Sequence, residues 1–354
     1  MDDELVGLFK DKDILVTGGT GTVGSKLVSE MLKYEPRAVR VFSRDESKQF
    51  DMFERLNHHP KVRMLIGDVR DKPRLNYAME DIDIVFHCAA MKHVPACEYN
   101  PFEAVRTNVI GTQNVIAAAL KCNVKKVVFT GTDKAAAPTN TMGATKLLAE
   151  RIISAANYYR GKRETVFTTI RFGNVMGSRG SVIPLFRDQI KRGGPVTVTN
   201  PRMTRFMMSL GQAVYLVFKA TLLCKGGEVF TLKMPTLHLE DLVAVLIEGL
   251  APKYGYKPEE MVIREVGLRP GEKMYEELLT EYDAVDALET DDLFITPSIL
   301  KEYLDLDVRG LYPGAVPIEI KRYTSEDYPA LSKEEIKKIL ESEGFIDVNY
   351  ETVW

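Results

Sequence analysis

The chain has 354 residues, and its 45% hydrophobic content is enough to bury a substantial core. Lys and Arg together number 47 against 50 Asp and Glu, which excludes the broad basic surface that binds nucleic acid or an anionic membrane. The sequence has no apolar run long enough for a membrane span, and its acidic start is unlike a secretory signal. We therefore expect a cytoplasmic protein.

The cysteines and histidines do not form a recognisable metal site. The five histidines have no metal-ligand spacing, and the four cysteines lack the paired spacing of a zinc site: Cys88, Cys97, Cys122 and Cys224. We expect reduced, structural thiols and no bound metal.

Apolar segments alternate with helix-period segments through the first half of the chain. We expect buried strands at 14–16, 39–42, 62–66, 84–86, 127–130 and 166–170, and helices near 22–33, 46–57, 72–79, 101–122 and 143–160. This alternation predicts an α/β fold, a Rossmann-type doubly wound parallel sheet with helices on both faces.

The second half follows a looser pattern, because glycine and proline interrupt it from about Gly173 onward. We expect residues 1–172 to form a dinucleotide-binding domain, to which later segments return. Residues 173–354 would form mainly a smaller, partly interleaved substrate-binding lobe and a C-terminal extension. A final helix is predicted over 333–341 with Ser332 as its N-cap, and no chemical motif is recognisable after about residue 280.

A glycine-rich turn follows the first predicted strand and leads directly into a helix. Gly18, Gly21 and Gly24 have a three-residue spacing, with Thr17, Thr22 and Val23 completing the turn. Glycine lets the backbone approach a pyrophosphate closely, and the helix N-terminus offers N–H groups and a positive dipole end to its charge. The strand–turn–helix context predicts a dinucleotide site.

The ends of the next two strands indicate which dinucleotide is bound. Ser43 and Arg44 follow the second strand and Lys48 comes one helical turn later, which favours the 2′-phosphate of NADP. The alternative is NAD, with Asp45 facing the ribose at a solvated helix start. Asp68 and Val69 follow the third strand, where Asp68 would contact the adenine amino group or would simply occupy a turn.

The candidate catalytic group follows the fifth predicted strand. It consists of five residues: Thr132, Asp133, Lys134, Met142 and Lys146. Met142 and Lys146 are four residues apart, so they share one face of a helix. A thioether can neither give nor take a proton. Either the site is inactive, or Asp133 and Lys134 carry the acid–base chemistry.

Six stretches in this order resemble an extended short-chain dehydrogenase/reductase: 87–95, 107–112, 132–135, 171–175, 178–186 and 203–207. The resemblance covers about residues 11 to 280 and is strongest to the UDP-N-acetylglucosamine 4,6-dehydratases of bacterial surface-polysaccharide pathways. It matches the branch in which Met replaces the catalytic Tyr.

The resemblance implies a tightly bound, recycled NADP, with NAD as the alternative. The cofactor takes the C4 hydride of the sugar, a base removes the C5 proton, the C6 hydroxyl leaves, and the hydride returns to C6. Asp133 and Lys134 match the family positions of the C5 base and C6 acid, in either order. Both roles become plausible if burial by the substrate raises the pKa of Asp133 and lowers that of Lys134.

The remaining roles also come from the resemblance. Lys146 would hold the nicotinamide ribose, and Thr132 would polarise the C4 oxygen. Met142 leaves three candidates for accepting the C4 hydroxyl proton: Asp133, Lys146 through water, or Thr132 as a relay. Asn108 would fix local water or backbone near the catalytic helix.

Ala89 and Ala90 would contact the cofactor, and Asn174 the sugar nucleotide. Lys92 would lie near the sugar or on the surface. Arg205 and Arg269 would clamp the diphosphate, because guanidinium groups bind phosphate oxygens in pairs, or would form surface ion pairs.

Three functions compete on this evidence. A sugar-nucleotide 4,6-dehydratase is favoured, with UDP as the nucleotide implied by the family and GDP or dTDP still open. A sugar-nucleotide 4-epimerase would ordinarily need the phenol that Met142 replaces. A noncatalytic dinucleotide-binding regulator would explain the lost tyrosine but not the retained acid and lysines. The resemblance also implies a homo-oligomer formed by helices beside the catalytic helix.

Overall fold

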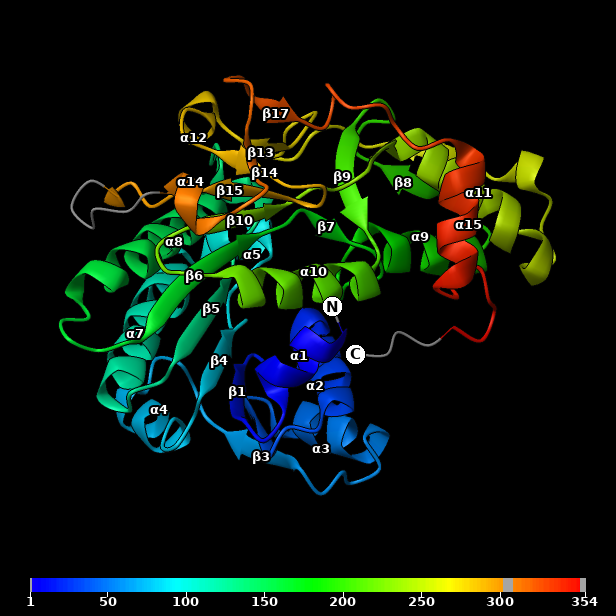
Figure 1. The fold of residues 1–354 in the computed structure, drawn as a ribbon. Helices are drawn as coiled ribbons and strands as arrows, with labels where there is room; N and C mark the ends of the chain where they lie inside the picture. The colour runs from blue at the N-terminus through cyan, green and yellow to red at the C-terminus, as the bar shows by residue number, and fades with distance from the viewer. Residues whose placement is uncertain (1, 302–307, 351–354) are drawn as a thin grey trace.

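The computed structural model describes residues 2–301 and 308–350, and its centre is a ten-stranded sheet (Figure 1). Seven strands are parallel, in the order β3-β2-β1-β4-β5-β6-β10. Their bounds are β1 Asp13–Thr17, β2 Ala38–Ser43, β3 Val62–Ile66, β4 Ile84–His87, β5 Lys126–Thr130, β6 Val166–Arg171 and β10 Val229–Leu232. This is the doubly wound order, so the predicted fold class is confirmed.

Helices cover both faces of this sheet, as predicted. One face carries α1 (Asp2–Phe9), α2 (Thr22–Met31), α3 (Glu46–Arg55) and α10 (Leu210–Leu223), whose apolar sides share one core with strands of the sheet, α2 beside β1, α3 beside β2, and α10 beside β6 and β10. The other face carries α4 (Lys72–Ala78), α7 (Gly111–Lys121) and α8 (Thr141–Tyr159). None of the described helices is both long enough and apolar enough to cross a membrane.

Three short antiparallel strands from late in the chain extend the sheet beyond β10: β15 Leu293–Thr296, β14 Leu288–Glu289 and β16 Val316–Pro317. A buried ion-pair cluster joins this region to the parallel strands. Arg171, at the end of β6, pairs with Glu150 at 2.6 Å and with Asp283 at 3.1 Å. The part of the chain after about residue 280, in which the sequence shows no chemical motif, therefore supplies the last three strands of the sheet.

A second hydrophobic core lies beside the end of the sheet. It joins α9 (Val182–Lys191), β8 (Val196–Val198), β9 (Thr204–Met208), α11 (Leu239–Leu250) and α15 (Lys333–Ser342). Ser332 and Glu335 form a capping box at the start of α15, so the predicted final helix and its N-cap are confirmed. Other short elements are β7 Asn174–Val175, β11 Thr236–His238, β12 Ile263–Glu265, β13 Glu277–Leu279, α12 Glu281–Ala284, α14 Val308–Leu311 and β17 Tyr323–Thr324.

The helix predicted over 101–122 is confirmed as one helical segment, which consists of α6 (Pro101–Ala104), a π-helical turn over Val105–Ile110, and α7. α5 (Val94–Tyr99) precedes them. Within the π turn, the Asn108 amide bonds to both the N–H and the carbonyl of Met91, at 2.8 and 3.0 Å, and donates to Thr145 of α8 at 3.0 Å. Asn108 therefore ties the loop after β4 to α8, as expected.

Candidate active site

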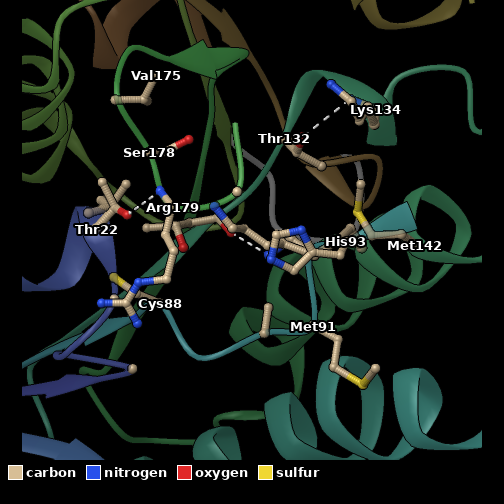
Figure 2. Close-up of a pocket in the computed structure, with 18 of the residues that line it drawn as sticks. Thr22, Cys88, Met91, His93, Thr132, Lys134, Met142, Val175, Ser178 and Arg179 are labelled. Carbon is tan, nitrogen blue, oxygen red and sulfur yellow. Dashed lines mark hydrogen bonds between the residues drawn. The ribbon is translucent and has the colours of Figure 1, made fainter. Parts of the chain in front are cut away.

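A cavity of about 830 Å³ opens where the carboxyl ends of the parallel strands meet the second core. Its wall comes from the glycine turn after β1, the loops after β2 to β6, the start of α8, and the segment that leads into β13. The crevice at the point where strand order reverses is the usual ligand site of such sheets. Figure 2 shows Thr22 and Arg179 at one end, and Thr132, Lys134 and Met142 at the other.

The glycine turn leaves no room for side chains. A Cβ on Gly18, whose φ is +65°, would lie 2.7 Å from the backbone nitrogen of Ala89, and a Cβ on Gly24 would lie 2.5 Å from the Gly18 carbonyl oxygen. Helix α2 begins directly after Gly21. The turn thus presents bare backbone and a helix N-terminus to the cavity, which fits the pyrophosphate of a dinucleotide.

Most of the predicted cofactor residues in and around the glycine turn line the cavity, and one lies behind the turn. Gly18, Gly21, Thr22, Val23, Gly24, Ala89 and Ala90 all line the cavity. Thr17 is fully buried behind the turn, where its hydroxyl contacts His87 Nδ1 at 2.7 Å. Thr17 therefore supports the turn from behind.

The outer end of the cavity is lined by Ser43, Arg44, Lys48, Asp68 and Val69. Each predicted cation there faces a carboxylate: Arg44 lies 3.6 Å from Asp68, and Lys48 lies 2.8 Å from Asp45. Asp45 also caps α3 by accepting from the Lys48 N–H at 3.0 Å. Burial would raise the pKa of Asp68, but hydrogen bonds from Arg70 hold it below the usual range. The choice between NADP and NAD stays a prediction.

Asp133 is buried, with 1% of its surface exposed, in a short turn after β5. Its Oδ1 accepts three hydrogen bonds, from the Thr132 hydroxyl at 2.9 Å, the Lys134 N–H at 2.9 Å and Lys134 Nζ at 3.1 Å. Its Oδ2 is buried and accepts none from any described residue. A buried carboxylate oxygen without a donor is rare, and here it belongs to a residue of the cavity wall.

The Lys134 ammonium is surrounded by oxygen atoms. Besides Asp133, it reaches Glu276 Oε1 at 3.2 Å and Asn174 Oδ1 at 3.4 Å. Burial alone would lower the pKa of Lys134, but the charges of Asp133 and Glu276 outweigh burial and raise it. The pKa of Lys134 is therefore shifted here in the direction opposite to the lowering expected on substrate burial.

Lys146 and Met142 lie on α8, and both line the cavity. Lys146 Nζ donates to the Thr130 carbonyl at 2.5 Å and lies 4.0 Å from the centre of the Phe129 ring. Burial lowers the pKa of Lys146 to about 8, so an uncharged amine is accessible near neutral pH. Met142 is 4% exposed and packs against Cys97 and Ala104.

Three of the four predicted substrate residues line the cavity: Lys92, Asn174 and Arg205. Burial and then the nearby Arg179 lower the pKa of Lys92, so two cations share this part of the wall. Arg269 is outside the wall. Its side chain is 57% exposed and lies 3.7 Å from Glu272.

Arg205 faces the protein more than the cavity. Its Nη1 and Nη2 donate to the carbonyls of Thr204, Met274 and Lys273 at 2.7 to 3.1 Å, and Nη2 also contacts Met203 Sδ at 3.2 Å. Its Nε lies 3.8 Å from Glu276. In this arrangement Arg205 holds a loop in place, and its predicted role as a diphosphate clamp stays a prediction.

Sequence reasoning gave no role to several charged residues of the wall, among them Arg179 and Glu276. Arg179 lies between Gly177 and Gly180, whose φ angles are +67° and +71°, and its backbone N–H donates to the Thr22 hydroxyl at 3.2 Å. The glycine spacing around Arg179 was a usable signal. Glu276 lies in the charged run 272–277, where the sequence does not show which acid faces inward.

Comparison with known proteins places the chain in a family. The family described as "Polysaccharide biosynthesis protein" matches residues 14–298. The chain is 41% identical to a UDP-N-acetylglucosamine 4,6-dehydratase (inverting) of Campylobacter jejuni, over 96% of this chain and 100% of the relative. It is also 42% identical to a UDP-glucose 4-epimerase of Rickettsia canadensis, over 94% of this chain and 96% of the relative.

A solved structure of Pen from Bacillus thuringiensis superposes with a TM-score of 0.87 at 51% identity, covering 94% of this chain and 98% of that one. These matches extend over nearly the whole chain, and they agree with the doubly wound sheet and the glycine turn. The chain belongs to the polysaccharide biosynthesis protein family of extended short-chain dehydrogenases/reductases.

Proposed function

We propose that this protein is a sugar-nucleotide 4,6-dehydratase that converts UDP-N-acetylglucosamine to a UDP-4-keto-6-deoxy-N-acetylhexosamine for surface glycan biosynthesis. The glycine turn would hold a nicotinamide dinucleotide, which when bound would accept the hydride from C4 and return it to C6. The similarity to a 4,6-dehydratase over the full length of that relative supports the reaction class. The observation that carries the proposal is the Asp133 carboxylate, whose Oδ1 lies 3.1 Å from the Lys134 ammonium and whose Oδ2 accepts no hydrogen bond from the described residues.

The reaction moves protons at three positions of the sugar, and the site offers a group for each. At C5, the unpartnered Oδ2 of Asp133 accepts the proton and later returns one to carbon. At C6, the Lys134 ammonium gives a proton to the hydroxyl as the C–O bond breaks, and water leaves.

The third position is the C4 hydroxyl, where the family usually has a phenol. Lys146 takes this role in our proposal, because its amine has a pKa of about 8 and borders the cavity on the same helix as Met142. The proton released at C4 equals the one consumed at C6, so the net reaction is loss of water. Thr132 now donates its single O–H to Asp133, and it polarises the C4 oxygen by turning that O–H toward the substrate.

For the cofactor, we propose NADP, tightly bound and recycled within each turnover. Arg44 and Lys48 border the outer end of the cavity, where they pair with Asp68 and Asp45. A 2′-phosphate at this end would bind the same two cations as a further anion. Denaturing the purified protein and identifying the released nucleotide by mass spectrometry tests this choice. Release of NAD alone would overturn it.

A 4-epimerase is the second candidate, because relatives of that name match the chain at 42% identity. An epimerase oxidises and re-reduces C4 but breaks no bond at C5 or C6. It therefore has no use for a buried acid and a fixed ammonium side by side. The Asp133–Lys134 pair favours the dehydratase.

Incubation with UDP-N-acetylglucosamine in deuterated water separates the candidates. We expect a product that has lost the mass of one water and carries deuterium at C5, detected by mass spectrometry and NMR. A C4 epimer of unchanged mass would establish the epimerase. No conversion, with cofactor bound, would indicate a noncatalytic regulator. Replacing UDP with GDP or dTDP in the same assay tests the nucleotide preference.

We also propose a homo-oligomer. Exposed apolar side chains gather on α5, α6, the π turn and α8, including Tyr99 at 88% and Phe102 at 82% exposure, together with Val105, Ile110 and Leu148. Apolar surface of this kind favours association. Light scattering should give a mass that is a multiple of 39.9 kDa, and Phe102→Asp should shift it toward the monomer. A wild-type monomer at micromolar concentration would contradict this proposal.

A further inference from the structure

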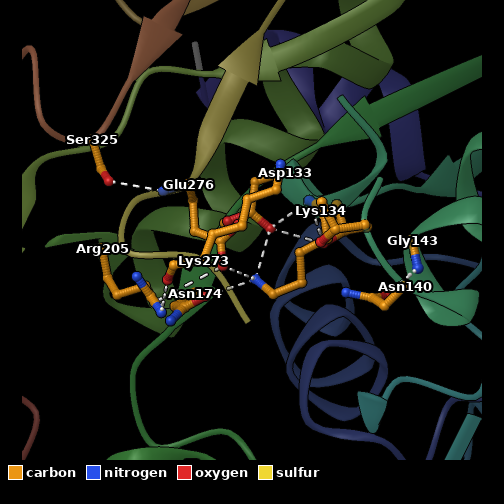
Figure 3. A network of polar contacts seen from close by, with 12 residues as sticks. Asp133, Lys134, Asn140, Gly143, Asn174, Arg205, Lys273, Glu276 and Ser325 are labelled. Carbon is orange, nitrogen blue, oxygen red and sulfur yellow. Dashed lines mark hydrogen bonds and ion pairs between the residues drawn. The ribbon is translucent and has the colours of Figure 1, made fainter. Parts of the chain in front are cut away.

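Glu276 is a buried carboxylate of the cavity wall that has no role so far in the reaction. Its side chain is 7% exposed, and its Oε1 lies 3.2 Å from Lys134 Nζ (Figure 3). Its backbone N–H donates to the Ser325 hydroxyl at 3.0 Å, and its carbonyl accepts from the Ser325 N–H at 2.9 Å. The backbone is thereby fixed on the side opposite the cavity.

The segment that carries Glu276 is fixed from two further sides. Arg205 binds the carbonyls of Lys273 and Met274, while its Nε faces Glu276 at 3.8 Å. Thr139 and Asn140 both donate to the Gly271 carbonyl at 3.1 Å. The Glu276 carboxylate therefore has a fixed position relative to Lys134.

An ammonium group has three N–H donors and no acceptor. Lys134 Nζ has three oxygen partners, at 3.1 Å on Asp133, 3.2 Å on Glu276 and 3.4 Å on Asn174. Two of these partners are carboxylates, and both are more than nine-tenths buried. An uncharged amine would leave one of the three oxygens without a donor and one buried carboxylate without compensation.

We infer that Glu276 is a positioning residue, whose carboxylate completes a three-oxygen cradle that holds Lys134 as an ammonium and so makes it the acid at C6 rather than the base at C5. This inference rests on the proposed function. In the step concerned, the C6–O bond breaks with its electron pair on oxygen, one N–H bond of Lys134 breaks, and the proton joins that oxygen to form water. Lys134 is left as an amine and regains a proton from solvent, to which the C4 proton is released.

The charge state of Lys134 can be tested without any substrate. The intact protein is labelled with acetic anhydride across a range of pH, and acetylation of Lys134 is measured by peptide mass spectrometry. Glu276→Gln keeps the shape of the side chain but removes its charge. We expect at least about a tenfold rise in Lys134 labelling near neutral pH, which corresponds to one pKa unit. Unchanged labelling would overturn the inference.

Two variants control this experiment. Glu272→Gln removes a carboxylate of the same segment that pairs with Arg269 and not with Lys134, so the labelling of Lys134 should stay as in the wild type. Glu276→Asp keeps the charge, and should restore slow labelling; it also covers the case in which the Gln variant does not fold. Fast labelling in Glu276→Asp would contradict the inference.

Activity supplies the second readout. In Glu276→Gln, the basic limb of the kcat profile should move to lower pH, because Lys134 loses its proton more readily, while KM changes little. A uniform loss at every pH would mean that Glu276 has only a structural role. If the wild-type protein dehydrates no sugar nucleotide, the proposed function fails, whereas the labelling result still decides whether Glu276 fixes the charge of Lys134.

Discussion

Asp133 and Lys134 are adjacent in sequence, and Lys134 Nζ lies 3.1 Å from Asp133 Oδ1 while Asp133 Oδ2 accepts no hydrogen bond from the described residues. In the proposed reaction, one oxygen of the carboxylate holds the acid and the other acts as the base. A carboxylate that served only to cap the end of the sheet would have no reason to keep a buried oxygen unpaired, because such an atom costs free energy.

Replacing Asp133 with Asn should remove the C5 base and preserve hydride transfer from C4. We expect turnover to fall by about 10² to 10⁴, the usual contribution of a general base. The variant should accumulate reduced nicotinamide when substrate is added, measured by its absorbance. If neither reduction nor turnover occurs, Asp133 serves the C4 hydroxyl instead.

The pH dependence follows from two lysines whose pKa values are shifted in opposite directions. Lys146 must be an uncharged amine to accept the C4 proton, so activity should rise as pH increases through about 8, where burial places its pKa. Lys134 must stay charged, and its raised pKa keeps it so until above the ordinary range for lysine. A rate that falls as pH rises through 8 would mean that Lys146 acts as a cation.

Met142 is a packing residue in this account, so its loss should affect stability and not chemistry. Met142→Leu conserves volume in a buried apolar cluster and should cost less than about 1.5 kcal/mol of unfolding free energy. Turnover should stay within a few-fold of the wild type. Chemical denaturation and steady-state rates measure both quantities, and a Leu variant that is stable but inactive would show that the thioether itself is needed.

A side chain added within the glycine turn should cause a selective loss of cofactor. Gly18→Ala places a methyl group 2.7 Å from the backbone of Ala89, inside the turn, so bound nucleotide should be lost on purification. Gly161→Ala is the matched control, because Gly161 has a similar φ of +62° but no neighbour within 4 Å of its added Cβ. Both variants bear the cost of positive φ, about 1 kcal/mol, and only Gly18→Ala should lose the nucleotide. Equal loss in both would indicate a general effect of instability.

The parallel sheet and the glycine turn were predictable because both depend on local sequence. Each of the six predicted strands occurs within two residues of its expected bounds, since apolar runs bounded by turns identify buried strands directly. The final helix was equally predictable from Ser332 and Glu335, which cap it. The π-helical turn within the helix over 101–122 was not, and its Asn108 contacts Met91 and Thr145, which are distant in sequence.

The candidate site was predictable only in part, for the same reason. Asp133, Lys134 and Lys146 follow a recognisable spacing, but the charge state of Lys134 depends on Glu276, which is 142 positions further along the chain. Arg269 has the residue type of a phosphate ligand and yet lies outside the cavity wall, since burial is set by tertiary packing and not by residue type. Arg171 likewise gives no sign in the sequence of the buried pairs it forms with Glu150 and Asp283.

The central claim is that the hydride taken from C4 returns to C6 of the same sugar. UDP-N-acetylglucosamine that carries deuterium at C4 tests this most directly, with the product examined by NMR after a single incubation in ordinary water. The account predicts a 4-ketone whose new C6 methyl group carries the deuterium. Deuterium that remains at C4 of a sugar with inverted configuration would contradict it and establish an epimerase.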